Sequence, residues 1–159
     1  MFSPADYAFM SYALRLAEKG LYGATPNPRV GCVITYNEQI VGSGWHERAG
    51  QPHAEINALN NAGGAARGAT VYVTLEPCAH YGRTPPCVNA LITAGIARVI
   101  IAMKDPNPLV SGRGKALLEL AGIDVQVGLL EAEASALNVG CLLYTSPSPR
   151  DRTRLRMPY

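Results

Sequence analysis

Three short segments of the chain carry an imidazole, a carboxylate and two thiols at spacings that suit a metal centre. His53 and Glu55 lie two residues apart, just after Pro52, and Cys78 and Cys87 follow further along the chain. Zinc binds histidine nitrogen and cysteine sulfur in tetrahedral geometry, and three protein ligands leave its fourth position for water. The residue types therefore predict a catalytic zinc site ligated by His53, Cys78 and Cys87.

His80, which lies between the two cysteines, is a rival fourth ligand that would close the site into a structural Cys2His2 centre. Glu55 favours the open site, because a carboxylate two residues after the ligand histidine has no role in a purely structural centre. Zinc lowers the pKa of its water, and a neighbouring carboxylate can move the released proton to a ring nitrogen and then to departing ammonia. This arrangement predicts hydrolytic deamination, with Glu55 as the proton-transfer residue.

The arrangement is similar to the His-x-Glu and Pro-Cys-x-x-Cys pattern of zinc deaminases, but eight residues instead of two separate Cys78 from Cys87. The segment TLEPCAHYGRTPPC at residues 74–87 closely resembles the diaminohydroxyphosphoribosylaminopyrimidine deaminases of riboflavin biosynthesis, in which the longer spacing is typical. The stretches NPRVGCVI, HAE and DPNPLVSGRG agree with the same family. The resemblance covers residues 5–140.

This resemblance implies a cytidine-deaminase-like enzyme that removes the 2-amino group of 2,5-diamino-6-ribosylamino-4(3H)-pyrimidinone 5′-phosphate, giving 5-amino-6-(5-phosphoribosylamino)uracil and ammonia. By matching positions it also implies four substrate contacts, which are Asn27, His46, His80 and Arg83. Amides and imidazoles can bind the polar edge of a ring, and arginine can bind phosphate through two hydrogen bonds. Without the family, Asn27 is equally a turn residue between two prolines, His46 a polar strand end and Arg83 a solvated loop cation.

Two other functions stay open: a different zinc deaminase, acting on a nucleoside, guanine or tRNA adenosine, and a structural zinc module without catalysis. Residues 141–159 carry four of the 14 basic residues and one of the 12 acidic ones, which leaves residues 1–140 with 10 basic and 11 acidic residues. A tRNA enzyme needs basic surface to hold phosphates, so this charge disfavours nucleic acid. We expect a small-molecule substrate and no membrane partner, and the resemblance leaves a homo-oligomer open.

The predicted elements give an α/β fold. Apolar runs with helical or strand periodicity, broken by proline, glycine and polar turns, mark each element. We expect helices over residues 4–17, 52–61, 85–94, 115–122 and 131–137, and strands over residues 30–35, 40–45, 69–75, 97–103 and 123–127. The first two strands form a hairpin through a polar turn at residues 37–39, and the later alternation predicts a mixed, largely parallel sheet. The resemblance implies a three-layer α/β/α cytidine-deaminase-like fold with about five strands and helices on both faces.

The metal ligands are expected at the starts of helices. Pro77 and Pro86, which precede the two cysteines, are typical first-turn residues, and there the helix dipole and free amides favour thiolate over thiol. Two further residues are expected to be structural. Cys32 lies in an apolar strand and is predicted to be a buried thiol, and Glu76 is predicted to accept hydrogen bonds that orient the site.

Length and composition predict the number of domains and the cellular location. A chain of 159 residues with 48% apolar residues suits one domain, predicted at residues 1–140. It has no apolar run long enough to span a membrane and no secretory signal, so we expect a soluble, cytoplasmic protein. Residues 141–159 lose all periodicity and resemble the conceptual translation of a transposon-type sequencing adapter, which predicts a non-native, disordered tail. In the family that the chain resembles, an NADPH-dependent reductase domain usually follows, and we expect it to be absent from residues 1–159.

Overall fold

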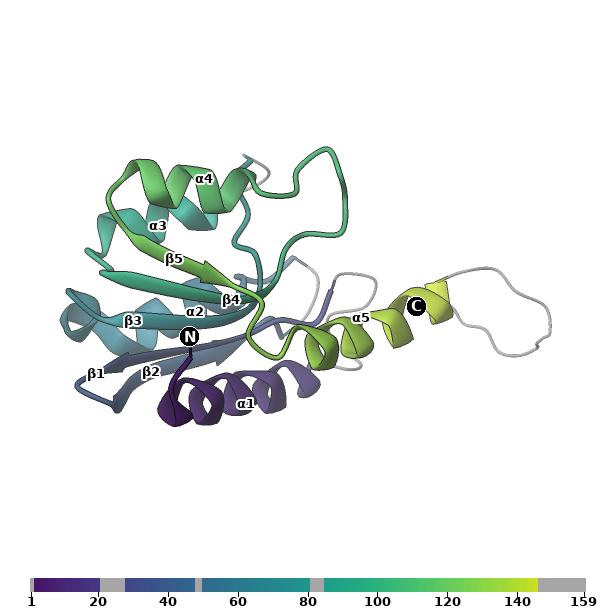
Figure 1. Cartoon of the computed structure of the whole chain (residues 1–159), viewed down its shortest axis with the longest axis horizontal. Helices are drawn as coiled ribbons and strands as arrows, with labels where there is room; N and C mark the ends of the chain where they lie inside the picture. Colours follow the sequence, from purple (N-terminus) through teal and green to yellow (C-terminus); the bar gives the residue numbers. More distant parts are fainter. Residues whose placement is uncertain (1, 21–27, 48–49, 81–84, 146–159) are drawn as a thin grey trace.

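In the described part of the chain, five strands and five α-helices form three layers with the sheet in the middle. The computed structural model describes residues 2–20, 28–47, 50–80 and 85–145, with side chains in these ranges up to residue 138. The elements along the chain are α1 (Pro4–Glu18), β1 (Gly31–Tyr36), β2 (Gln39–Trp45), α2 (Ala54–Ala62), the 3-10 helix η1 (Gly63–Ala66), β3 (Thr70–Leu75), α3 (Cys87–Thr93), β4 (Arg98–Met103), α4 (Arg113–Leu120), β5 (Asp124–Val127) and α5 (Glu131–Thr145). Helices α1 and α5 cover one face of the sheet, and α2, α3 and α4 cover the other (Figure 1). The predicted α/β/α architecture is confirmed.

The sheet has the strand order β2-β1-β3-β4-β5. β1 is antiparallel to both β2 and β3, whereas β3, β4 and β5 are parallel to one another. Side chains alternate between the two cores: Cys32 and Ile34 pack beneath α2, while Val33 between them packs against α1. The mixed, largely parallel sheet is confirmed: because β1 is antiparallel to both of its neighbours, it runs against the other four strands, which share one direction.

Local sequence explains how several elements begin and turn. Ser3 caps α1, its side chain and that of Asp6 form a capping box, and Pro4 is the first residue of the helix. The hairpin of β1 and β2 turns at Asn37 and Glu38, whose φ angles of 51° and 61° are both positive, as a two-residue hairpin turn of the favoured kind requires. The predicted helix start at residue 4 is confirmed, and the hairpin turn lies within the predicted residues 37–39.

Several predicted helix boundaries differ from those in the structure. α2 begins at Ala54 with His53 as its N-cap, so Pro52 precedes the helix instead of starting it. The last helix extends beyond its predicted end at residue 137, and its backbone continues through Thr145. Residues 141–145 of the predicted tail are therefore helical, and residues 146–159 lie outside the described residues. The non-native origin of this tail stays a prediction.

Among the helices of the described residues, none is long and apolar enough to cross a membrane.

Asp6 joins the first helix to the sheet and should be important for stability. Its buried carboxylate accepts hydrogen bonds from the Tyr72 hydroxyl at 2.7 Å, from the Ser3 amide at 3.0 Å and from the Arg98 guanidinium at 3.2 Å. Burial alone raises the pKa of Asp6, but these hydrogen bonds and the charge of Arg98 outweigh it, so its pKa is lowered in the folded protein. Its stabilisation is therefore complete above the unfolded pKa and is lost as the pH falls through the lower, folded pKa.

We expect Asp6→Asn to lower the free energy of unfolding at neutral pH by about 1–3 kcal/mol, because charge-assisted hydrogen bonds are lost. The difference from the unmodified protein should shrink as the pH falls below about 4, the unfolded pKa, and should vanish below the lower pKa of the folded protein. Urea unfolding at both pH values measures this. Asp124→Asn, at an exposed position, is the control; an equal loss there, or a loss independent of pH, would contradict the role of Asp6.

Candidate metal centre and cavity

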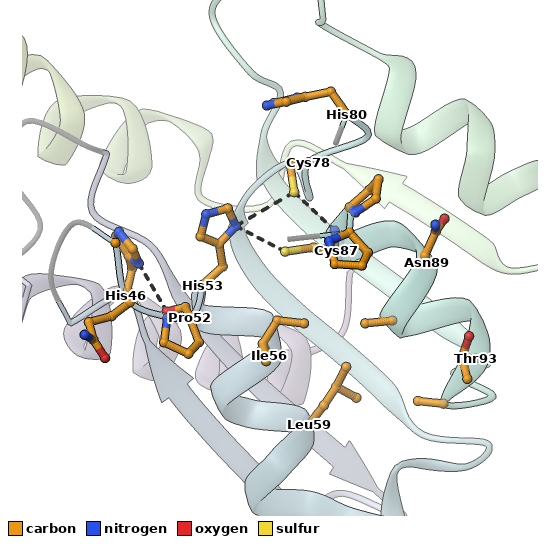
Figure 2. Close-up of a pocket in the computed structure, with 16 residues that line it drawn as sticks. His46, Pro52, His53, Ile56, Leu59, Cys78, His80, Cys87, Asn89 and Thr93 are labelled. Atoms are coloured by element: carbon orange, nitrogen blue, oxygen red, sulfur yellow. Dashed lines mark hydrogen bonds between the residues drawn. The ribbon is translucent and has the colours of Figure 1, made fainter. Parts of the chain in front are cut away.

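An imidazole nitrogen and two sulfurs converge beyond the carboxyl end of the central strand β3. The Nδ1 atom of His53 lies 3.2 Å from the Sγ atom of Cys87 and 3.8 Å from the Sγ atom of Cys78 (Figure 2). The three ligand atoms all lie within 4.8 Å of one another. Among the His, Cys, Asp and Glu side chains of the described residues, these three form the group that could hold a metal ion. The sequence predicted these three residues.

Each of the three residues is positioned by the end of an element. His53 is the N-cap of α2, Cys87 is the first residue of α3, and Cys78 follows the carboxyl end of β3. The expectation that Cys78 starts a helix of its own is wrong, because the described residues around it are not helical. It nevertheless uses the N-terminus of α3: the Cys87 amide donates a hydrogen bond to the Cys78 sulfur at 3.1 Å.

The electrostatics of the two sulfurs differ. The hydrogen bond from the Cys87 thiol, followed by the bonds from His53 and the Cys87 amide, lowers the pKa of Cys78 to about 4. The same sulfur-to-sulfur contact, together with burial, raises the pKa of Cys87. The hydrogen bond with Cys78 raises the pKa of His53. These three groups lie close enough to share protons, and a divalent cation bound among them would favour both sulfurs as thiolates. This donor set fits zinc.

Glu55 lies in the first turn of α2, two residues after His53, and its side chain is only 3% exposed. Burial raises the pKa of its carboxyl group to about 7. A carboxyl group with a pKa near the working pH can both accept and return a proton. Its burial and raised pKa support the proton-transfer role of Glu55, which stays a prediction.

The structure describes two of the four predicted substrate-binding residues. His46 and His80 both line the cavity beside the sulfurs, and His80 is not part of the metal-binding group. His46 is buried, donates a hydrogen bond from Nδ1 to the Pro52 carbonyl at 3.2 Å, and lies edge-on to the His53 ring. Burial lowers its pKa. Asn27 and Arg83 lie outside the described residues, so their roles stay predictions.

The cavity has a volume of about 1040 Å³ and extends from the sulfurs along the space between α2 and α3. Ile56 and Leu59 of α2 and Asn89 and Thr93 of α3 form its far walls (Figure 2). Sequence reasoning missed these four residues. Their spacings of three and four residues place each pair on one helix face, but that signal does not tell a cavity wall from a core face.

Glu76 connects the metal-binding region to the segment that follows β4. Its carboxylate accepts hydrogen bonds from the amides of Asp105 at 3.1 Å, Gly112 at 3.0 Å and Lys115 at 3.0 Å. These contacts cap the start of α4 and hold the preceding loop, so Glu76 accepts structural hydrogen bonds, while its orientation of the site stays a prediction. Cys32, as predicted, is fully buried in β1, and burial raises its pKa well above the usual range.

Comparison with known proteins adds independent information. Residues 3–103 match the family described as the cytidine and deoxycytidylate deaminase zinc-binding region. The chain is 58% identical over 137 residues to the riboflavin biosynthesis protein RibD of Escherichia coli K12, a match that covers 86% of this chain and 37% of that protein. It therefore spans less than half the length of that relative.

A shorter relative is covered almost completely. The diaminohydroxyphosphoribosylamino-pyrimidine deaminase of Buchnera aphidicola subsp. Schizaphis graminum is 52% identical over 135 residues, which are 85% of this chain and 92% of that protein. Among solved structures, Acinetobacter baumannii RibD, form 2, superposes with a TM-score of 0.85 at 55% identity over 87% of this chain and 39% of that one. Aspergillus oryzae Rib2 deaminase in complex with DARIPP has a TM-score of 0.63 at 25% identity, over 86% and 98% of the two chains.

The sequence match, the shared fold and the His/Cys/Cys group agree with one another. The chain belongs to the cytidine and deoxycytidylate deaminase zinc-binding family, and within it to the diaminohydroxyphosphoribosylaminopyrimidine deaminases of riboflavin biosynthesis.

Proposed function

We propose that this chain catalyses the zinc-dependent hydrolytic deamination of 2,5-diamino-6-ribosylamino-4(3H)-pyrimidinone 5′-phosphate. The observation that carries the proposal is a buried carboxyl group, Glu55, two residues after the histidine of a His/Cys/Cys group at the wall of a large cavity. A purely structural metal site needs neither the carboxyl group nor the cavity. The products are 5-amino-6-(5-phosphoribosylamino)uracil and ammonia.

His53, Cys78 and Cys87 are the residues that would hold zinc. Their three ligand atoms converge within 4.8 Å, and three ligands leave a tetrahedral ion one position for a non-protein ligand. When bound, zinc acts as a Lewis acid that brings the pKa of water toward neutrality. The amide hydrogen bond from Cys87 to the Cys78 sulfur orients that ligand and stabilises its negative charge.

Glu55 would move the protons of the reaction. Its carboxylate accepts a proton from the attacking water and delivers it to the ring nitrogen next to the carbon that bears the amino group. After the hydroxyl oxygen has bonded to that carbon, Glu55 takes the hydroxyl proton and passes it to the amino group. The carbon–nitrogen bond then breaks and ammonia leaves, while the carbon keeps the oxygen as a carbonyl. Burial supports this role, because water cannot compete for the protons.

The substrate class is supported by the relatives and by the cavity. The Buchnera relative is named for a diaminohydroxyphosphoribosylamino-pyrimidine substrate, and the Aspergillus oryzae structure is a complex with DARIPP. His46 and His80 line the cavity and offer ring nitrogens to the polar edges of a pyrimidine. We assign Asn27 and Arg83 to the same substrate by matching positions, with Arg83 as a phosphate ligand.

The chemistry of the ligand cysteines bears on the compartment in which the protein works. Thiolate ligands require reduced cysteines, which supports a cytoplasmic location. The proposed partner is the small phosphorylated aminopyrimidine and not a nucleic acid. A homo-oligomer stays a prediction.

The test compares three substrates. Ammonia release is measured from the phosphorylated aminopyrimidine, from cytidine and from a tRNA stem-loop, using zinc-loaded protein. We expect turnover of the phosphorylated aminopyrimidine alone. Turnover of only cytidine or the stem-loop would replace the proposed substrate, and turnover of none of the three would support a structural zinc module instead.

A further inference from the structure

The N-terminus of α2 carries both His53 and Glu55, yet it lacks the usual side-chain cap. His53 occupies the N-cap position, where Ser, Thr, Asp or Asn would normally accept a hydrogen bond from the first turn, and its side chain makes no such bond. The imidazole is directed to the sulfurs of Cys78 and Cys87 instead. Other contacts must therefore fix where this helix begins.

Asn57, one turn into the helix, supplies such contacts. Its side-chain amide donates hydrogen bonds to the Trp45 carbonyl at 2.8 Å and to the Pro52 carbonyl at 3.3 Å. Trp45 is the last residue of β2, and Pro52 is the residue just before the N-cap of α2. One side chain thus connects both ends of the segment between β2 and α2. The Pro52 carbonyl also accepts the hydrogen bond from His46 (Figure 2).

Close packing beneath the helix makes this connection sensitive. A Cβ atom on Gly44 would lie 2.7 Å from the Cβ atom of Asn57 and 2.8 Å from the Ala58 amide nitrogen. A Cβ atom on Gly42 would lie 2.5 Å from the Ala58 carbonyl oxygen. The backbone of α2 therefore rests directly on the glycines of β2, which sets the distance between helix and strand. Side-chain hydrogen bonds between the two elements then limit how far α2 can slide along β2.

The residue type also points to a specific role. Asparagine inside a helix is less favourable than alanine, because its amide competes with the backbone for hydrogen bonds. In the helix, side chains lean toward the N-terminus, so the amide of Asn57 reaches back over the turn that holds His53 and Glu55. A residue that only filled space here would not need two donors.

We propose that Asn57 is a positioning residue of the metal centre: by linking the Trp45 and Pro52 carbonyls it fixes the start of α2 and hence the places of His53 and Glu55. This inference rests on the proposed function for its catalytic consequence. Its consequence for zinc binding rests only on the fit of His53, Cys78 and Cys87 to the ion.

The chain offers a matched control at the other end of the same helix. Asn61 accepts a hydrogen bond from the Ser43 amide at 3.1 Å, so it also ties α2 to β2, but two turns away from His53. If Asn57 only holds the helix on the sheet, then Asn57→Ala and Asn61→Ala should have similar effects. If it positions the metal centre, only the first should change zinc binding and turnover.

The test uses Asn57→Ala, Asn57→Leu and Asn61→Ala in the full chain. Alanine and leucine have higher helix propensity than asparagine, so all three variants are expected to fold. Zinc affinity is measured by competition with a chromogenic chelator, stability by urea unfolding, and kcat and KM by ammonia release. We expect both Asn57 variants to bind zinc about 10–100-fold more weakly and to lose more in kcat than in KM, at urea midpoints similar to that of Asn61→Ala.

Two results would overturn the proposal. One is an Asn57→Ala or Asn57→Leu protein with unchanged zinc affinity and unchanged kcat. The other is an Asn61→Ala protein that loses zinc affinity and kcat to the same degree, because that would indicate a general loss of helix packing. If the unmodified protein releases no ammonia, the proposed function fails, while the zinc measurement still decides the role of Asn57.

Discussion

Replacing Glu55 with glutamine is expected to slow ammonia release by about 10²–10⁴-fold while the protein keeps its zinc. Glutamine has the shape of glutamate but cannot accept and return a proton, and Glu55 is not one of the three residues that converge as metal ligands. The carboxyl group is buried, so bulk water cannot take over its role easily. Steady-state turnover and zinc content per chain, measured on the same preparation, test this expectation.

Glu76→Gln is the matched control, because Glu76 is the other buried glutamate of this region. Its carboxylate accepts hydrogen bonds from three backbone amides and is not directed to the metal-binding group. This variant should unfold at a lower urea concentration but keep most of its turnover. A Glu55→Gln protein that kept its full rate, or that lost its zinc, would show that the role given to Glu55 is wrong.

The second large effect is expected for Cys87→Ala. The Cys87 sulfur is buried at the start of α3 and lies 3.2 Å from the His53 Nδ1 atom. Loss of a residue that only orients a ligand costs about 10–100-fold in metal affinity, so loss of a ligand itself should cost more than about 100-fold. We expect the variant to lose its zinc on dialysis against a chelator and to show no measurable ammonia release.

Cys32→Ala tests whether this effect is specific. Cys32 is equally buried, but it belongs to the apolar core beneath α2 and not to the metal-binding group. Its substitution should reduce stability through a small cavity and leave zinc content and turnover unchanged. Equal zinc loss in the two cysteine variants would contradict the assignment of Cys87 as a ligand.

Much of the fold follows from local sequence, because local rules determine single elements. The turn at Asn37 and Glu38, the capped start of α1 at Ser3 and the alternation along β1 were all predictable in this way. The pairing of β3 with β1 was not, since strand order and direction depend on contacts between distant residues.

The candidate site divides in a similar way. The residue types and spacings of His53, Cys78 and Cys87 were sufficient to predict a metal group. Pro77 suggested a helix start at Cys78. The Cys78 sulfur instead accepts a hydrogen bond from the Cys87 amide, and a contact between residues on separate segments leaves no local sequence pattern. The role of Asn57 is hidden for the same reason, because its partners are backbone carbonyls whose nearness depends on the tertiary fold.

X-ray absorption at the zinc edge of the purified protein tests the central claim most directly. The predicted spectrum has two sulfur atoms at about 2.3 Å, one imidazole nitrogen at about 2.0–2.1 Å and one further light atom that belongs to no side chain. Scattering from a second imidazole would instead indicate a closed centre that includes His80. That result, or a spectrum without sulfur ligands, would contradict an open centre formed by His53, Cys78 and Cys87.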